Sequence, residues 1–283
     1  MKLILGGYHE AYIRLLDLDS MVINKVSSYA NTSYMFIDNE FIYSIVRINE
    51  LAGLVKLDKN NMNVACINVH ESIPSCYVFK HNNYIFTCNY HLGTLNIYTE
   101  QLSIVKILIF KDNSKIHCIT FNNNHYYVCD LSNDCIYKFD HNFNLLDTIT
   151  LVNRCGPRHI IFDNDVMYVA CELSNELIVL DNDIIIRRIK LSDDINASVA
   201  AIKQDELNIY ISVRGTNKIY IISKKDLEIV NCLDTLGRDP RDFLVHNNYI
   251  IIVHQNSDDI TIYKEYELFT TIKAGKYIYI DKL

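Results

Sequence analysis

The chain has 283 residues, a formal net charge of −7 and 49% hydrophobic residues. An acidic chain is a poor partner for nucleic acid, because binding to phosphates depends on Lys and Arg. No apolar run approaches the roughly 18 residues of a membrane span, and the apolar run at residues 3–5 is too short for a signal peptide. We therefore expect a cytoplasmic protein that binds neither nucleic acid nor membrane.

Short apolar runs separated by polar turns recur along the chain with a period of 41 to 43 residues. Runs rich in Val, Ile and Tyr and bounded by Asn and Asp are typical of strands. Pro74, Pro157 and Pro240 each stand just ahead of a repeat, where the missing N–H is tolerated. In chain order the strand pairs are 33–36 with 42–45, 76–79 with 84–87, 117–121 with 126–129, 157–162 with 166–172, 199–202 with 209–212, and 241–244 with 250–253.

A period near 42 residues with about four strands per unit indicates a β-propeller blade. Six units fill about 31–272, and the two ends supply a seventh, in which residues 276–280 pair with 3–5 while 11–16 and 21–26 complete the sheet. We predict an all-β, seven-bladed β-propeller with four-stranded antiparallel blades. It forms one domain over residues 1–283, and blade 7 combines about 1–28 with 275–283. The alternatives, a β-sandwich or a solenoid, do not need both termini in one sheet.

The nine cysteines lie mostly inside apolar strand runs, as Cys88, Cys129 and Cys171 do, and no CxxC pair occurs. Buried free thiols in a reducing cytosol explain this pattern, and disulfides or zinc are the alternative. No P-loop, dinucleotide fingerprint or nucleophile elbow is present. Asp130, Glu172 and His117 can be imagined around a metal, but arginines nearby disfavour a cation, so we predict no metal and no cofactor.

Polar residues recur at equivalent places in the units and predict two rings of side chains around the channel, because rotation about the propeller axis relates equivalent positions. The ends of the second strands supply Arg47, Asn89, Asp130, Glu172, Arg214 and Gln255. The starts of the first strands supply Ser33, Cys76, His117, Arg158, Val199 and Arg241, with Tyr34, Tyr77 and His159 next to them. Four of the nine arginines fall in these rings, so we expect a locally basic site.

Guanidinium groups hold carboxylate or phosphate in two hydrogen bonds, so this site is suited to a small anionic compound. The alternative is that the charges only join the inner strands of neighbouring blades. In that case Asp130 and Glu172 pair with Arg158 and Arg214.

Several motifs, in order and at the right period, resemble the seven-bladed β-propeller lactonase family, which includes the propeller-type 6-phosphogluconolactonases and the carboxy-cis,cis-muconate lactonising enzyme. They are Gly156-Pro157-Arg158-His159 with Cys171-Glu172-Leu173-Ser174-Asn175, Ser212-Val213-Arg214-Gly215, and Asp239-Pro240-Arg241-Asp242-Phe243 with Gln255-Asn256-Ser257-Asp258. Cys88-Asn89-Tyr90-His91-Leu92-Gly93-Thr94 and Cys129-Asp130-Leu131-Ser132-Asn133-Asp134 look like the corresponding signatures of other blades.

The resemblance covers essentially the whole chain and implies a catalytic set at the channel mouth, namely His117, Glu172, Arg158 and Arg214. Candidates for substrate binding are Arg47, Asn89, Asp130, His159, Arg241 and Gln255. The chain departs from the family pattern where Ile116 replaces a proline, Tyr77 a histidine and Arg47 a glutamate.

The implied activity is metal-independent hydrolysis of a small anionic sugar lactone, 6-phosphogluconolactone first among them. Lactone opening needs a base for water, stabilisation of the oxyanion and a proton for the leaving alkoxide. A desolvated Glu172 would have a raised pKa and act as acid or base, with His117 as its alternative or partner. Arg158 and Arg214 would hold the oxyanion and the charged tail of the substrate.

Two other functions stay open at this point: a lactonising or isomerising enzyme of the carboxymuconate type, and a non-catalytic propeller that binds a metabolite or a protein. A channel plugged by Tyr34 and Tyr77 would favour the non-catalytic propeller.

Overall fold

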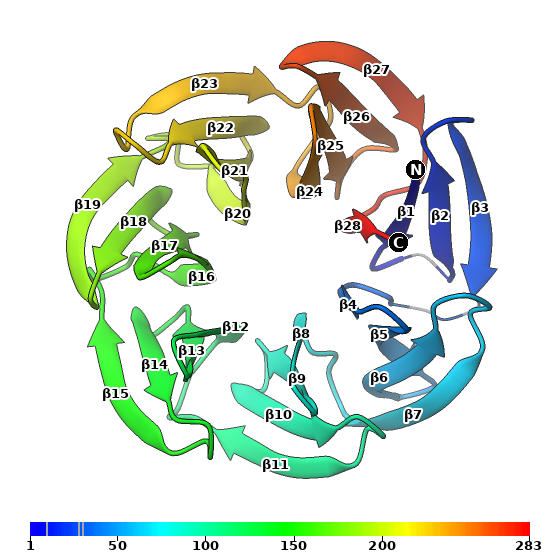
Figure 1. The fold of residues 1–283 in the computed structure, drawn as a ribbon, viewed down its shortest axis with the longest axis vertical. Coiled ribbons are helices and arrows are strands. Elements are labelled where there is room, and N and C mark those ends of the chain that lie inside the picture. Colours follow the sequence, from blue (N-terminus) through cyan, green and yellow to red (C-terminus); the bar gives the residue numbers. More distant parts are fainter. Residues whose placement is uncertain (10, 28, 30) are drawn as a thin grey trace.

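The computed structural model describes residues 1–9, 11–27, 29 and 31–283, and over these residues it contains strands and no helix. The strands form seven four-stranded antiparallel sheets arranged in a ring (Figure 1). The predicted seven-bladed β-propeller is therefore confirmed. Since the described residues hold no helix at all, none of them belongs to a helix that could span a membrane.

Each of the first six blades is a continuous stretch of chain, and its strands follow one another from the centre of the ring to the rim. Blade 1 contains β4 (Met35–Ile37), β5 (Phe41–Ile48), β6 (Leu51–Asp58) and β7 (Val64–Glu71). Blade 2 contains β8 (Tyr77–His81), β9 (Tyr84–Asn89), β10 (Thr94–Thr99) and β11 (Ile104–Ile109). Blade 3 contains β12 (Ile116–Asn122), β13 (His125–Asp130), β14 (Cys135–Phe139) and β15 (Leu145–Thr150).

The next three blades repeat this plan. Blade 4 contains β16 (Pro157–Asp163), β17 (Val166–Cys171), β18 (Glu176–Asp181) and β19 (Ile184–Lys190). Blade 5 contains β20 (Ser198–Gln204), β21 (Asn208–Arg214), β22 (Lys218–Ser223) and β23 (Ile229–Asp234). Blade 6 contains β24 (Pro240–His246), β25 (Tyr249–His254), β26 (Asp259–Lys264) and β27 (Glu267–Lys273).

Blade 7 joins the two ends of the chain, as predicted. Its innermost strand is β28 (Tyr279–Lys282), followed by β1 (Lys2–Gly6), β2 (Ile13–Asp17) and β3 (Val22–Ser27). Gly6 pairs with Tyr279, three residues after the start of the predicted strand 276–280. A side chain at Gly6 would not fit, because a Cβ there would lie 2.0 Å from the carbonyl oxygen of Thr32.

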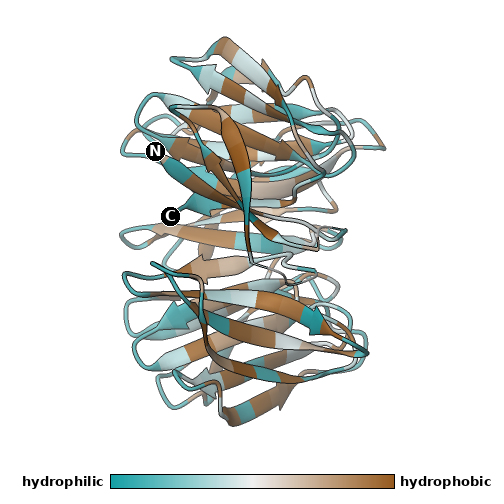
Figure 2. Ribbon diagram, turned by 90° about the vertical axis from the view of Figure 1, so that its right-hand side faces the viewer, coloured by the Kyte–Doolittle hydropathy of each residue, from teal (hydrophilic) through white to brown (hydrophobic). Residues whose placement is uncertain are grey.

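The hydrophobic core consists of clusters between neighbouring blades. The middle strands are buried on both faces, which explains their continuous apolar runs, whereas outer strands such as β11 are largely exposed. Figure 2 shows the same division, with hydrophobic strands and hydrophilic loops at both faces of the ring. Between blades 3 and 4, Cys118, Cys129, Cys155 and Cys171 are part of such a cluster. All nine cysteines are free and six are buried, as expected for structural thiols.

One turn residue recurs between the second and third strands of four successive blades, and in three of them its side chain ties the blade to the next. Gly93, Asp134, Asn175 and Asn217 have φ values of 64°, 50°, 53° and 56°. Their carbonyl oxygens accept hydrogen bonds from the residue just after the fourth strand of the same blade. The side chains of Asp134, Asn175 and Asn217 then accept backbone N–H groups at the entrance of the following blade. These turns thus set where the innermost strands of blades 4, 5 and 6 begin.

Candidate active site

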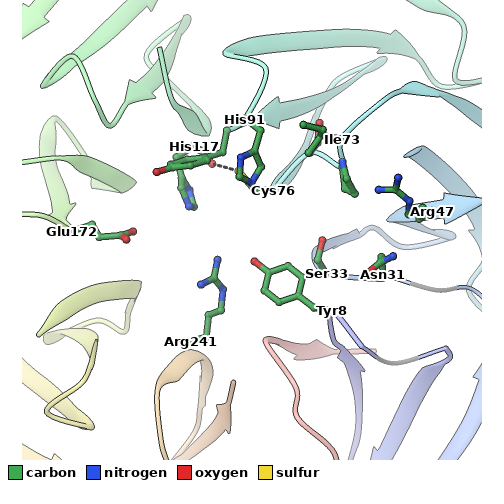
Figure 3. A pocket seen from close by; sticks show the side chains of 13 residues that line it. Tyr8, Asn31, Ser33, Arg47, Ile73, Cys76, His91, His117, Glu172 and Arg241 are labelled. Carbon is green, nitrogen blue, oxygen red and sulfur yellow. Dashed lines mark hydrogen bonds between the residues drawn. The ribbon is translucent and has the colours of Figure 1, made fainter. Parts of the chain in front are cut away.

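A cavity of about 380 Å³ lies where the innermost strands of the blades begin. Most blades contribute to its wall: Tyr8 comes from blade 7, Arg47 from blade 1, His117 from blade 3, Glu172 from blade 4 and Arg241 from blade 6. Figure 3 shows Glu172, His117 and Arg241 grouped toward one side and Arg47 on the opposite side.

Three of the predicted residues occupy β-bulges at the start of their innermost strands. The strand register shifts between Ile116 and Cys118, between Pro157 and His159, and between Pro240 and Asp242. His117, Arg158 and Arg241 are the extra residues at these shifts. A bulge leaves one residue out of the ladder and re-aims its side chain. The recurrence of these residues at one or two blade periods in the sequence therefore has a common structural cause.

Glu172 is held between two arginines. Its Oε2 lies 2.8 Å from Nε of Arg158 and its Oε1 lies 2.9 Å from Nη2 of Arg214. The three side chains are 22%, 4% and 16% exposed, respectively. Burial raises the pKa of Glu172, but the neighbouring arginine charges outweigh burial and hold that pKa below its ordinary value. The predicted raised pKa is therefore wrong, because the arginines surround the carboxylate more closely than the sequence shows.

Arg158 and Arg214 contact Glu172 but are not among the residues that line the cavity. Nη1 of Arg158 donates to the carbonyl oxygen of Ala200, and Nη2 of Arg214 donates to the Ser198 hydroxyl at 2.6 Å. Both guanidinium groups are thus largely engaged by protein atoms. The pairing of Glu172 with both arginines agrees with the alternative in which the charges join the inner strands, but only Arg214 comes from a neighbouring blade. Asp130, the other acid of that alternative, pairs with neither arginine and accepts from Ser114 and Lys115.

His117 lines the cavity and is 4% exposed. Burial lowers its pKa well below the usual value for histidine, and the charges of Arg158, His159 and Arg241 lower it further. Its Nδ1 is buried without a hydrogen-bond partner, which also favours the uncharged ring. His117 is therefore a neutral imidazole at physiological pH.

Arg241 is the cationic side chain of the cavity wall next to His117 and Glu172. Its Nη1 donates to Oε1 of Gln255 at 3.1 Å, and its guanidinium carbon lies 5.3 Å from the ring centre of Tyr8. Burial lowers the pKa of Arg241 to about 10, with the charges of Arg158 and Arg214 acting in the same direction. Arg241 stays charged near neutral pH, and Gln255 holds it in place.

An aromatic layer packs across the channel one residue deeper along the innermost strands. The Tyr34 ring centre lies 4.5 Å from that of Tyr77 and 4.9 Å from that of Tyr279. Tyr77 reaches His159 of blade 4 at 5.4 Å, and His159 lies 5.1 Å from His117. Tyr34 and Tyr77 therefore occupy the channel, but they form a floor and leave the cavity in place. The predicted substrate-binding residue His159 belongs to this floor.

Asn89 and Asp130 do not line the cavity. Asn89 donates to Glu71 and to the carbonyl oxygen of Ile73, both at 2.8 Å. Asp130 accepts from the Ser114 hydroxyl at 2.6 Å and from the Lys115 N–H at 3.0 Å. Each side chain therefore fastens the loop that leads into an innermost strand.

The pairing of strands explains why Asn89 and Asp130 do not line the cavity, whereas Glu172 does. Asn89, Asp130 and Cys171 occupy equivalent places, because they pair with Thr94, Cys135 and Glu176. Glu172 thus corresponds to Tyr90, which lines the cavity, and to Leu131. The predicted ring therefore mixes two registers: Arg47, which pairs with Ala52, stands like Asn89 and Asp130 one residue before the place of Glu172. Such a shift turns a side chain to the other face of the strand, and of these three residues only Arg47 lines the cavity.

The family model "Lactonase, 7-bladed beta-propeller" matches residues 2–267 of the chain. The chain belongs to this lactonase family. It is 25% identical to the 6-phosphogluconolactonase of Bacillus subtilis over 89% of this chain and 86% of the relative. It is 26% identical to an uncharacterised protein of Lactococcus lactis subsp. cremoris over 93% of this chain and 91% of the relative.

Solved structures share the fold of this lactonase family member. A protein from Lactobacillus plantarum gives a TM-score of 0.88 at 21% identity and covers 100% of this chain and 99% of its own. The periplasmic gluconolactonase of Pseudomonas aeruginosa gives a TM-score of 0.83 at 14% identity and covers 99% of this chain and 98% of its own. At these identities the likeness concerns the fold alone.

The lactonase cavity also contains residues that sequence reasoning missed. They come from loops and turns: Tyr8, Asn31, Ile73, Pro74, Ser75, Tyr90 and His91. Tyr90 was detectable in principle, since it stands 82 residues before Glu172 in the corrected register, twice the period of 41. Within the described ranges no three His, Cys, Asp or Glu side chains are grouped as metal ligands.

Proposed function

We propose that this protein hydrolyses a small anionic sugar lactone, with 6-phosphogluconolactone as the first candidate. The observation that carries the proposal is the neutral His117 on the same side of the cavity as Glu172 and Arg241, with Arg158 and Arg214 paired to Glu172. The B. subtilis relative named 6-phosphogluconolactonase supports the choice of substrate.

Among these groups, His117 is the one suited to move the proton. Both carboxylate oxygens of Glu172 are engaged by arginines, whereas no carboxylate pairs with His117 in the described ranges of the chain. His117 takes a proton from water as the hydroxide adds to the lactone carbonyl carbon. The ring C–O bond then breaks, and the imidazolium returns the proton to the leaving alkoxide. A lowered pKa makes the imidazolium a good acid for this second step.

Arg241 and Glu172 have supporting electrostatic roles in this mechanism. Arg241 faces the cavity beside His117 and stabilises the negative charge that develops on the carbonyl oxygen. Glu172 stays ionised, keeps Arg158 and Arg214 in place and accepts hydrogen bonds from sugar hydroxyls. The reaction is independent of metal in this proposal. The protein acts in the cytoplasm, as its buried free thiols favour.

The decisive experiment is hydrolysis of freshly generated 6-phosphogluconolactone, measured against its spontaneous rate. We expect the wild type to accelerate opening, and His117→Gln and Glu172→Gln to lower kcat/KM by about 100-fold or more. Dialysis against EDTA should leave the activity unchanged. Arg187→Gln is the control, because Arg187 lies on the outer strand β19 and pairs with Glu228.

Circular dichroism and thermal unfolding of each variant separate loss of catalysis from loss of fold. A wild type that leaves the spontaneous rate unchanged would contradict the proposal. Activity would then be sought with carboxylate lactones of the muconate type, and after that binding partners of a non-catalytic propeller.

A further inference from the structure

The arginines at and near the cavity differ in how many of their hydrogen bonds and ion pairs are made with other protein groups. Arg158 and Arg214 share the carboxylate of Glu172. Arg47 and Arg241 line the cavity and form no salt bridge within the described ranges. The Nη2 atom of Arg47 donates at 3.2 Å to the backbone carbonyl oxygen of Glu50, and the side chain is half-buried. Arg47 and Arg241 are therefore the guanidinium groups available to a ligand.

These two arginines stand on opposite sides of the cavity. Arg241 lies on the side of Glu172 and His117, whereas Arg47 lies across from them, beyond Ser33 and Asn31 (Figure 3). They come from blades 6 and 1, with blade 7 between them in the ring. A ligand that contacts both must carry an electron-rich group at each end.

The side chains next to Arg47 offer no acid–base group to the lactone ring, and the second cavity histidine, His91, lies nearer to His117 than to Arg47 in Figure 3. Asn31 and Ser33 are neutral, and the hydroxyl of Ser75 already donates to Glu71. A permanent dianion beside His117 would favour the charged imidazole and oppose its role as a base. The permanent charge of the substrate thus belongs at Arg47, and the reacting carbonyl belongs at Arg241.

We propose that the cavity recognises both ends of a terminally phosphorylated aldonic acid, with Arg47 binding the phosphate and Arg241 the carboxyl end. This inference rests on the proposed lactonase function and assigns Arg47 as its specificity residue. The planar fork of Arg47 matches a phosphate in two charge-assisted hydrogen bonds. Hydrolysis creates a carboxylate at the Arg241 end, so the open-chain product carries an anion at each arginine.

Calorimetric titration with three stable compounds at fixed ionic strength tests this assignment directly. 6-Phosphogluconate carries both anionic ends, gluconate has only the carboxylate, and glucose 6-phosphate has only the phosphate. For the wild type we expect 6-phosphogluconate to bind at least 10-fold more tightly than either of the others. Arg47→Ala should weaken the affinity for 6-phosphogluconate by about 10- to 100-fold and change the affinity for gluconate by no more than about 2-fold.

Matched variants sharpen the result. Arg47→Lys keeps the charge without the fork and should recover only part of the lost affinity. Arg241→Ala should bind 6-phosphogluconate no more tightly than glucose 6-phosphate. Arg187→Ala, on the rim of blade 4, should change no affinity.

Equal weakening of gluconate and 6-phosphogluconate in Arg47→Ala would overturn the assignment, as would a wild type that does not bind 6-phosphogluconate. Binding is read without turnover, so the two proposals fail separately. An Arg47-dependent phosphate preference in a protein that opens no lactone would contradict the proposed function only. Lactone hydrolysis without that preference would contradict the role of Arg47 only.

Discussion

The same arginine charges lower the pKa of both Glu172 and His117, which favours the charged form of the glutamate and the neutral form of the histidine. The cations lower the pKa of Glu172, which stabilises its ionised form in the folded protein. This contribution to stability is present above the ordinary pKa of a glutamate and is lost as the pH falls through the lowered value. The same cations, together with burial, keep His117 neutral. Near neutral pH one side chain is therefore a fixed anion and the other a neutral base.

The pH dependence of catalysis follows from this arrangement. If neutral His117 is the base, kcat/KM falls only when the pH drops through its lowered pKa, so the acid limb should lie well below pH 6.5. After burial, Arg158 is the main cause of the lowering. Arg158→Gln should therefore move the acid limb to higher pH, whereas Arg187→Gln should not. Profiles of kcat/KM, corrected for spontaneous opening, check this, and an acid limb that does not move in Arg158→Gln would refute the assignment.

The sequence identified most of the charged residues of the site, but it offered the pairing of Glu172 with Arg158 and Arg214 only as one of two alternatives. The same bulge opens the innermost strands of blades 3, 4 and 6, so His117, Arg158 and Arg241 could be found from spacing alone. Asn89 and Asp130 could not be placed, because the pairing of strands across a hairpin decides which residue faces the channel and the spacing allows an error of one. The engagement of Arg158 and Arg214 by Glu172 depends on side-chain distances that no pattern of letters contains.

At the scale of the elements, the turns between second and third strands position the innermost strands. The backbone of Asn217 lies in the left-handed region with a φ of 56°, and its side chain accepts the N–H of Asp239 at 2.7 Å. Asp239 directly precedes the strand that carries Arg241. One turn residue thus links the geometry of blade 5 to the cavity wall in blade 6.

Replacement of Asn217 separates the two contributions of this turn. Asn217→Ala loses the hydrogen bond and strains the backbone, at a combined cost of roughly 2 kcal/mol. Asn217→Gly loses the same bond but adopts a positive φ without strain, so it should be less destabilising than Ala. Urea unfolding measures both, with the exposed Lys225→Ala as control. Equal stability of the Ala and Gly variants would show that the backbone conformation is unimportant here.

The strands themselves were well predicted because each blade repeats the same alternation of apolar runs and Asn- or Asp-rich turns. Blade 4 was expected at 157–162 and 166–172, and the structure places β16 and β17 at Pro157–Asp163 and Val166–Cys171. The C-terminal strand was placed three residues too early. Lys276, Tyr277 and Ile278 have an apolar pattern like that of the true strand, and only the register against β1 distinguishes them.

At the scale of the whole molecule, blade 7 closes the ring. Tyr279 and Ile280 are 2% and 0% exposed, and the Ile280 N–H donates at 3.3 Å to the carboxylate of Asp242. Lys203 of blade 5 pairs with the same carboxylate at 3.3 Å. Blades 5, 6 and 7 therefore meet at one buried group.

Removal of the closing strand should be costly. A chain that ends at Ile278 loses the burial of Tyr279 and Ile280, so we expect it to lose roughly 4 kcal/mol of unfolding free energy or more. It should also lose lactone hydrolysis, since Tyr279 supports Tyr34 in the floor of the cavity. A chain that lacks only Leu283 keeps the strand and should lose far less. Retention of the full urea midpoint by the shorter chain would contradict this view of the closure.

The split of blade 7 has a consequence for biosynthesis. A ribosome makes β1, β2 and β3 first, but their innermost neighbour β28 emerges only after all six other blades. Blades 1 to 6 can pair internally during translation, while the nascent chain carries an open β1 edge throughout. Tyr8 of the wall and Tyr279 of the floor both lie in this late-finished blade. A partly translated chain therefore lacks part of the cavity wall and floor, and the cavity is complete only in the closed ring.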